Sequence, residues 1–299
     1  METFKTTCDL YFKEPNFIKN CANETCDDSY AEKKSSIKTI IFQNEFATVN
    51  NAVVSVDLSE KEDGSILAYL IENVDDPEIY TAYIQSNETI YLPADSANFF
   101  NYFTETVNGN YSSELTSIEG LEYVDTSQVT NMHRMFYDLR YLSRLNLSHF
   151  DTSNVTNMSY MFANDAAVVN APVLLELDLS SFDTSKVTSM SNMFSGQRNI
   201  VRLDVSSFDT SQVTNIGYMF YGLDVEKLDL SHFDTSNVTN MGGMFRDTSI
   251  QELNLSSFDT TKVTYFHQFF QGSNALTNVI YGEKFVYRND ANVSWKGSV

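Results

Sequence analysis

The second half of this chain carries one sequence motif five times, preceded by a weaker sixth copy. In chain order, repeats 1 to 6 occupy residues 121–136, 145–162, 177–194, 203–220, 228–245 and 253–270. The aspartate of their shared Asp-Thr-Ser or Asp-Thr-Thr triplet recurs at intervals of 26, 32, 26, 25 and 25 residues. Self-similarity at such a period is typical of solenoids, in which each unit buries its apolar face against its neighbours. The repeats therefore favour a binding function over catalysis.

Each repeat joins a strand signal to a helix signal. The Leu-x-Leu pattern alternates inward and outward side chains, as a strand does. The apolar residues after the triplet in repeat 2 are Val155, Met158, Met161 and Phe162. Their spacing suits one face of a short helix that packs into the core. The aspartates of the triplets are predicted to cap turns, because short polar side chains accept backbone N–H bonds: Asp151, Asp183, Asp209, Asp234 and Asp259.

The repeated string resembles that of the BspA-like leucine-rich-repeat bacterial surface proteins, whose repeat has the 26-residue period seen here. The whole string Phe-Asp-Thr-Ser-x-Val-Thr-x-Met-x-x-Met-Phe recurs, and the resemblance covers roughly residues 121–270. The preceding stretches DGSILAYLIE and TIYLPADSANFFNYF also look like the lead-in segment of that family. The resemblance implies a leucine-rich-repeat solenoid displayed outside the cell as an adhesin or ligand-binding protein. It implies no catalytic residues.

The predicted fold class is an α/β solenoid, a leucine-rich-repeat-like right-handed coil with a parallel sheet, short helices and a β-rich N-terminal cap. Strand signals at 37–42, 52–58, 66–71, 79–85 and 89–92, joined by turns at 62–64 and 86–88, predict a small antiparallel element for this cap. Residues 95–103 resemble a decayed copy of the repeat helix. The predicted parts are an irregular cysteine-bearing arm (1–36), the cap (37–103), the solenoid (104–275) and a C-terminal cap (276–299) in which Trp295 covers the last repeat or contacts a partner.

The charge of the chain excludes some partners. Its 299 residues include 40 acidic and 19 basic ones, which gives a formal charge of −21. Nucleic-acid binding needs Lys and Arg to replace counterions, and anionic membranes repel such a chain. The acidity favours solubility, or else basic partners or divalent cations. We also expect no membrane insertion, because no apolar run is long enough to span a bilayer and the first residues show no secretory leader.

No sequence motif for catalysis or for a cofactor is present. The chain lacks a phosphate-binding glycine loop, a Gly-x-Ser-x-Gly elbow and a His-Glu-x-x-His pair, so we expect no enzyme activity, no cofactor and no metal. The cysteines are Cys8, Cys21 and Cys26. Three alternatives remain for them: one disulfide with a thiol left over, free thiols in a reducing compartment, or a metal site completed by a distant histidine.

The candidate binding residues lie on the outward face of the predicted sheet. In a parallel ladder, equivalent residues of successive repeats stack about 4.8 Å apart. One outward row is Arg144, Glu176, Arg202, Lys227 and Glu252, and the next is Asn146, Asp178, Asp204, Asp229 and Asn254. These rows either neutralise one another through salt bridges or dock an extended partner. A cation held by the three aspartates is a weaker alternative.

The combined prediction is a non-enzymatic recognition or adhesion module at the cell surface or outside the cell. Its partner would be a protein or a glycan, bound on the sheet face or at the insertion at residues 163–172. The alternative is a structural protein of a virion or appendage, such as a phage fibre or decoration protein, with the solenoid as a rigid spacer. The arm at 1–36 would then attach the protein to a larger assembly.

Overall fold

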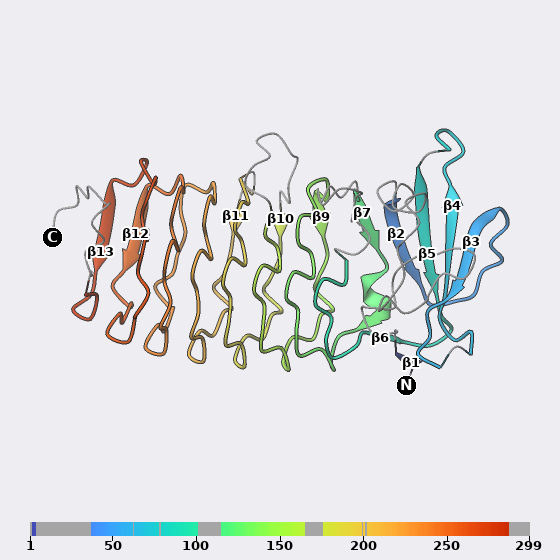
Figure 1. Ribbon diagram of the computed structural model, residues 1–299, viewed down its shortest axis with the longest axis horizontal. Coiled ribbons are helices and arrows are strands. Elements are labelled where there is room, and N and C mark those ends of the chain that lie inside the picture. The colour runs from blue at the N-terminus through green and yellow to red at the C-terminus, as the bar shows by residue number, and fades with distance from the viewer. Residues whose placement is uncertain are drawn as a thin grey trace, which may run out of the picture.

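A computed structural model describes residues 2–3, 37–61, 63–77, 79–100, 115–164, 176–198, 200 and 202–286. The molecule is elongated, with a twisted sheet at its N-terminal end and the repeats stacked along the long axis (Figure 1). The three cysteines, Trp295 and most of the insertion at 163–172 lie outside the described residues. No helix in the described part is long and apolar enough to cross a bilayer.

The N-terminal sheet is mixed, whereas the sequence predicted an antiparallel element. It contains β2 (Ile37–Gln43), β3 (Ala52–Asp57), β4 (Leu67–Glu72), β5 (Tyr80–Gln85) and β7 (Ser117–Glu119), in the order β3-β4-β5-β2-β7. The pairs β3–β4 and β4–β5 are antiparallel, but β2 is parallel to both β5 and β7. The parallel pairs could not be foreseen from local turns, because they join segments far apart in the chain.

The fifth predicted strand belongs to the repeats and not to this sheet. β6 (Ile90–Tyr91) pairs in parallel with β1 (Glu2–Thr3) and β8 (Val124–Asp125), so no hairpin joins it to β5. The residues after β6 stack on repeat 1, because the Ser96 N–H donates to the Asn131 carbonyl at 3.0 Å and the Phe100 N–H donates to the Met135 carbonyl at 3.1 Å. The predicted decayed repeat copy is therefore confirmed over its described residues.

The Leu-x-Leu segments form short parallel strands in register. They are β9 (Arg144–Leu145), β10 (Glu176–Leu177), β11 (Arg202–Leu203), β12 (Glu252–Leu255) and β13 (Asn278–Tyr281). Leu177 lies opposite both Leu145 and Leu203, and β12 is paired with β13 along its whole length. Equivalent residues of successive repeats therefore lie side by side.

The predicted α/β fold class of the leucine-rich-repeat type is wrong, because the molecule is nearly all β. Within the described residues the helical structure is a single 3₁₀ turn, η4 (Leu121–Tyr123). Tyr160 stands where the helix of repeat 2 was predicted, and its φ is +60°, a left-handed value that ends any right-handed helix. The Tyr160 and Phe162 N–H groups donate to Ser191 and Met193 of repeat 3 at 2.9 and 3.0 Å. Backbone groups that a helix would pair internally are thus paired between repeats.

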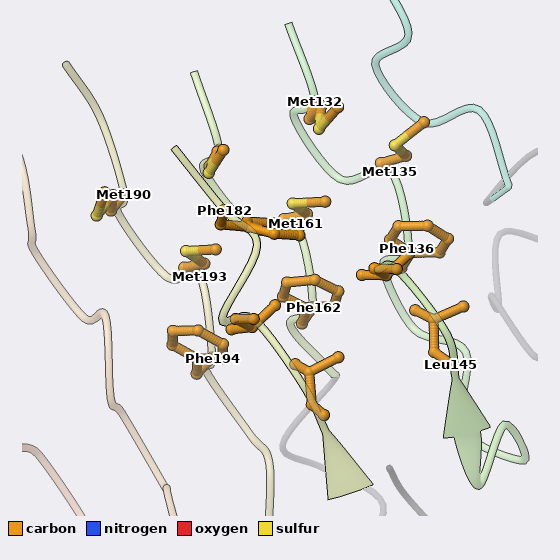
Figure 2. Close-up of a cluster of buried hydrophobic side chains, with 14 of the residues drawn as sticks. Met132, Met135, Phe136, Leu145, Met161, Phe162, Phe182, Met190, Met193 and Phe194 are labelled. Carbon is orange, nitrogen blue, oxygen red and sulfur yellow. The ribbon is translucent and has the colours of Figure 1, made fainter. Parts of the chain in front are cut away.

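The apolar residues of these segments fill one continuous core. A column of phenylalanines runs through the stack, and consecutive ring centroids along it are 4.9 to 6.0 Å apart: Phe100, Phe136, Phe162, Phe194, Phe220, Phe245 and Phe270. The methionines beside them are fully buried (Figure 2). The prediction that the methionine pairs fill the core is confirmed, because a polarizable thioether adapts to the gaps between rings.

The Asp-Thr-Ser triplets form the corner between the strand side and the core segments. Their aspartates cap turns as predicted, each accepting the N–H two residues later at 2.9 to 3.0 Å. Their threonines are buried and link adjacent repeats. Thr152 Oγ1 donates to the Asp183 carbonyl at 3.0 Å and accepts the Asp183 N–H at 2.9 Å. This corner fixes the positions of the outward rows that precede it.

Candidate functional site

The two predicted rows lie on the molecular surface. The leucines that flank them are buried, with Leu145, Leu177 and Leu203 at 6 to 7 % exposure, whereas the described row side chains are exposed. Alternation along the short strands therefore places the rows outward, as the sequence predicted. The backbone of Glu176 pairs with Arg202 in the same register.

The aspartates of the second row are held by local hydrogen bonds. Asp178, Asp204 and Asp229 each accept the backbone N–H of the serine two residues later, at 2.9, 3.1 and 2.9 Å. Hydrogen bonds from the side chains and the backbone N–H groups of Ser180, Ser206 and Ser231 lower the pKa of the three carboxyl groups below the ordinary aspartate value. Asn146 and Asn254 accept the same bond at the ends of the row. The three aspartates are therefore fixed, ionised acceptors at neutral pH.

Salt bridges within the rows are sparse. Arg202 Nη2 lies 3.2 Å from Asp204 Oδ2, and both side chains are largely exposed, so the pair contributes little to stability. Lys227 makes no salt bridge with any residue that the structure describes. Its ammonium group is therefore available to a ligand in the same row as Arg202, one repeat farther along the stack.

A groove opens on this face between repeats 4 and 5. Its volume is about 670 Å³ and it is lined by Arg202, Leu203, Asp204, Val205, Ser206, Val225, Glu226, Lys227 and Asp229. Leu203, Val205 and Val225 are buried at 7, 2 and 4 % exposure and form an apolar floor. Four of the predicted row residues thus converge on one concave site, with two cations toward one end of the strands and two carboxylates toward the other.

The groove coincides with an interruption in strand pairing. β11 pairs with β10, and Lys227 pairs with Glu252, but the described residues show no pairing between β11 and the segment around Lys227. Figure 1 accordingly draws no arrow for the segment of repeat 5 between β11 and β12. The connecting loop is one residue shorter here than between Phe194 and Leu203, but it has the same length as the loop between Phe245 and Leu253, where pairing is intact.

A longer side chain spans the junction at the groove. Ser181, Ser207 and Ser257 occupy one repeat position, and each hydroxyl donates to a carbonyl of the preceding repeat. His232 occupies this position at the groove, and its Nε2 lies 2.9 Å from the Val205 carbonyl oxygen. The imidazole of His232 therefore contacts the preceding repeat at the position where serine hydroxyls do so elsewhere.

The remaining predicted residues stay outside the groove. Arg144, Asn146 and Asp178 continue the rows toward the N-terminal sheet, and Glu252 and Asn254 continue them along β12. Sequence reasoning missed Val225 and Glu226 as lining residues. The repeat period does not mark them, because it is 25 residues both at this junction and between Asp234 and Asp259.

The described residues offer no metal site. Among them no group of three or more His, Cys, Asp or Glu side chains is arranged to hold a metal ion. Asp178, Asp204 and Asp229 are neighbours in one row, but they do not form a coordinating cluster. The three cysteines lie outside the described residues.

A second polar cluster lies on the side of the stack that was predicted to be helical. The Arg134 guanidinium carbon is 5.1 and 4.9 Å from the ring centroids of Tyr137 and Tyr160, which places the cation between two aromatic faces. The pKa of the neighbouring His133 is lowered by burial and by the charge of Arg134. The sequence analysis did not single out this cluster, because its residues come from different repeats.

A three-repeat unit occurs twice in the stack. Lys186 Nζ donates to Asn154 Oδ1 at 2.7 Å, and Asn154 Nδ2 donates to the Ser127 carbonyl at 2.9 Å. Repeats 4 to 6 reproduce this chain of bonds, since Lys262 donates to Asn237 at 2.8 Å and Asn237 donates to the Ser211 carbonyl at 2.8 Å. Repeats 1 to 3 and 4 to 6 are therefore copies of one larger unit.

The comparisons with known proteins divide the chain between repeats 3 and 4 as well. A family model described as "Mycoplasma protein of unknown function, DUF285" matches the chain twice, over residues 103–200 and 196–294. No curated protein and no solved structure matches the chain. The family match agrees with the resemblance to BspA-like surface repeat proteins, but the family is not a leucine-rich-repeat family, so that part of the prediction is wrong. Because the two matches together span more than half of the sequence, the chain belongs to the family described as Mycoplasma protein of unknown function, DUF285.

Proposed function

We propose that this protein is a non-enzymatic recognition or adhesion module that acts at the cell surface and binds a protein or a glycan through the outward rows of its repeats. The observation that carries the proposal is the division of each repeat into a constant interior and a variable exterior. Buried leucines, methionines and phenylalanines recur from repeat to repeat. The outward positions change charge, from Arg202 and Lys227 to Glu252.

Rigidity of the backbone supports this role. Hydrogen bonds between repeats hold each outward residue at a fixed level, and the turn bonds of Asp178, Asp204 and Asp229 fix their side chains. A preorganised surface loses little conformational entropy when a partner binds. Many modest contacts along the stack can then sum to a useful affinity.

The test has two arms. Antibody labelling of intact producing cells asks whether the protein is displayed, and binding of the purified protein to a glycan array and to immobilised extracellular-matrix proteins asks what it recognises. Arg202→Glu combined with Lys227→Glu is expected to weaken capture, while Arg144→Glu in the same row is the matched control. Display without any captured glycan or matrix protein would contradict the proposed function.

A structural role in a virion or appendage is the second candidate. The continuous phenylalanine column and the bonds between repeats favour it, because they make the stack stiff along its long axis. Immunogold labelling of purified virions or appendages at regular positions would support this role. Labelling confined to the cell envelope would exclude it.

A further inference from the structure

We infer that the guanidinium group of Arg134, held against the rings of Tyr137 and Tyr160, binds the carboxylate of a uronic-acid sugar. The site belongs to the segments after the Asp-Thr-Ser triplets and not to the outward rows, so it goes beyond the proposed function. Three observations carry the inference: the aromatic corner that orients the guanidinium, its lack of an acceptor among the described residues, and the pairing of the surrounding backbone.

Arg134 occupies a repeat position at which the backbone is constant and the side chain varies. The equivalent residues have φ of +56 to +60°, and they are Asn98, Arg134, Tyr160, Asn192, Tyr218, Gly243 and Gln268. Arg134 is the only charged residue among these seven. The fold therefore requires a left-handed backbone here but no cation, so the arginine is a feature of this chain and not of the repeat.

Two tyrosines hold the guanidinium of Arg134 in one orientation. Its carbon atom lies 5.1 Å from the ring centroid of Tyr137 and 4.9 Å from that of Tyr160, and the two ring planes meet at 71°. The Tyr160 ring also has His133 edge-on to it, with 5.7 Å between the ring centroids. A cation that is fixed in this way loses little conformational freedom when a ligand binds.

The guanidinium of Arg134 has no acceptor within the part of the chain that the structure describes. The side chain makes no hydrogen bond or ion pair there, and its Nε is buried without a partner. Arg246 also lies over a tyrosine ring, that of Tyr221 at 5.6 Å, but its Nε donates to Asp247 at 3.2 Å and its Nη1 donates to Gln268 at 2.8 Å. Buried polar groups are normally hydrogen-bonded, so the unused donors of Arg134 point to an oxyanion supplied by a ligand.

The charge of the site favours a ligand with one negative group. Burial and the charge of Arg134 lower the pKa of His133 below its ordinary value of 6.5, so this imidazole is neutral at neutral pH and adds no second cation. A planar guanidinium matches a planar carboxylate through two parallel N–H···O bonds. The chain as a whole has a formal charge of −21, which repels ligands with many negative charges. The matching group is a single carboxylate.

The surrounding backbone favours a sugar over a peptide as the carrier of this carboxylate. The N–H and C=O groups of Arg134 and of Tyr160 are all hydrogen-bonded to other backbone groups, at 2.9 to 3.1 Å. An extended peptide gains affinity from main-chain bonds, and these groups are not available for them. A sugar needs only side chains, because its C–H groups pack on aromatic rings while its hydroxyls bond to polar groups at the rim.

Saturation-transfer difference NMR measures binding of small sugars to the full chain. The probe is methyl β-D-glucuronide, and the matched control is methyl β-D-glucoside, which lacks the carboxylate. The peptide Ac-Gly-Glu-Gly-NH₂ carries a carboxylate on a different body. We expect saturable binding of the glucuronide and binding at least about tenfold weaker for both the glucoside and the peptide, because each lacks part of the match. No binding of the glucuronide, or equal binding of either comparison ligand, would overturn the inference.

A pair of variants locates the site. Arg134→Gln removes the cation against Tyr137 and Tyr160, whereas Arg246→Gln makes the same change at a stacked arginine that already has acceptors within the protein. Only Arg134→Gln should weaken glucuronide binding by about tenfold or more, and equal effects would place the sugar elsewhere. Circular dichroism establishes that both variants remain folded. If Arg134→Gln does not fold, Arg134→Lys replaces it, because lysine keeps the charge but cannot form two parallel bonds.

A negative result at Arg134 is distinct from a negative result on the strand face. If the glucuronide does not bind while Arg202→Glu with Lys227→Glu still weakens array capture, the Arg134 site fails and the proposed function stands. If the glucuronide binds at Arg134 while the protein is neither displayed nor captures any array partner, the proposed function fails and the Arg134 site stands.

Discussion

Single side chains hold the repeats together at their corners. Thr210 is buried at 2 % exposure, and its Oγ1 donates to the Asp234 carbonyl at 2.9 Å and accepts the Asp234 N–H at 2.8 Å. Thr214, four residues later, donates to the Thr188 carbonyl at 3.2 Å from an exposed position. The two threonines make similar bonds in different surroundings, which separates the effect of burial from the effect of bonding.

Thr210→Val should therefore destabilise the protein more than Thr214→Val does. Valine has nearly the shape of threonine but leaves the Asp234 carbonyl and N–H unsatisfied in the interior, which costs about 1–3 kcal/mol. At position 214, water replaces the lost hydroxyl. Urea unfolding followed by circular dichroism measures both changes. Similar midpoints for the two variants would show that the buried bonds are not stabilising.

The left-handed position of repeat 5 gives a second prediction. Gly243 has φ of +59°, and an added Cβ would lie 2.2 Å from the Tyr218 ring. Gly64 has φ of +76° and open space around it. Alanine at either site incurs a left-handed strain of about 1–2 kcal/mol, but only Gly243→Ala must also displace the tyrosine. Gly243→Ala should lower the melting temperature more than Gly64→Ala, and adding Tyr218→Ala to it should remove most of the excess.

At the scale of elements, the sequence predicts the repeats better than their secondary structure. The recurrence of Leu-x-Leu and of the methionine and phenylalanine positions correctly predicts the buried face, and the aspartates cap turns as expected. The helix prediction fails because φ is positive at Tyr160 and Tyr218, and tyrosine gives no hint of a left-handed backbone. Equivalent positions do give one: Asn98, Asn192 and Gly243 are residue types that tolerate this conformation.

The groove, too, could be predicted only in part from the sequence. Arg202 and Lys227 could be placed on an outward row from periodicity alone. Their convergence on a concave site depends on the interrupted pairing between β11 and the segment at Lys227. The short connecting loop beside it does not predict this interruption, because the loop between Phe245 and Leu253 is equally short and Lys227 still pairs with Glu252.

Because phenylalanine rings stack along the core, the loss of stability on replacing one by alanine should depend on its position in the stack. Phe194 is fully buried between the rings of Phe162 and Phe220, at 5.9 and 6.0 Å. Phe194→Ala should cost about 3–5 kcal/mol, because neither neighbouring repeat can collapse into the space. Phe270→Ala, at the last repeat, should cost less. Guanidinium unfolding measures both, and an equal loss would indicate that the end repeat is held as firmly as the middle.

At the scale of the whole molecule, the regular aspartates couple folding to pH. Bonds from Ser185 and Ser236 lower the pKa of Asp183 and Asp234 in the folded protein. A carboxyl group with a lowered folded pKa stabilises the protein above its unfolded pKa, about 3.9, and this contribution is lost as the pH falls through the folded value. The free energy of unfolding should therefore fall as the pH drops below about 3.9 toward the folded pKa of these aspartates.

The variant Asp183→Asn/Asp234→Asn tests this coupling. Asparagine keeps the oxygen that accepts the backbone N–H but does not titrate. The urea midpoint of the variant should fall less than that of the unmodified protein between about pH 6 and pH 3. Identical slopes would assign the acid sensitivity to other carboxyl groups of this chain.

The duplicated unit of three repeats bears on how the chain can become longer during evolution. Repeat 3 meets repeat 4 through the same phenylalanine column and the same backbone bonds that join repeats within either copy. The top of one unit is thus complementary to the bottom of the next. A gene segment that encodes three repeats can be inserted in tandem without creating a new kind of joint, so relatives of different length can share identical ends.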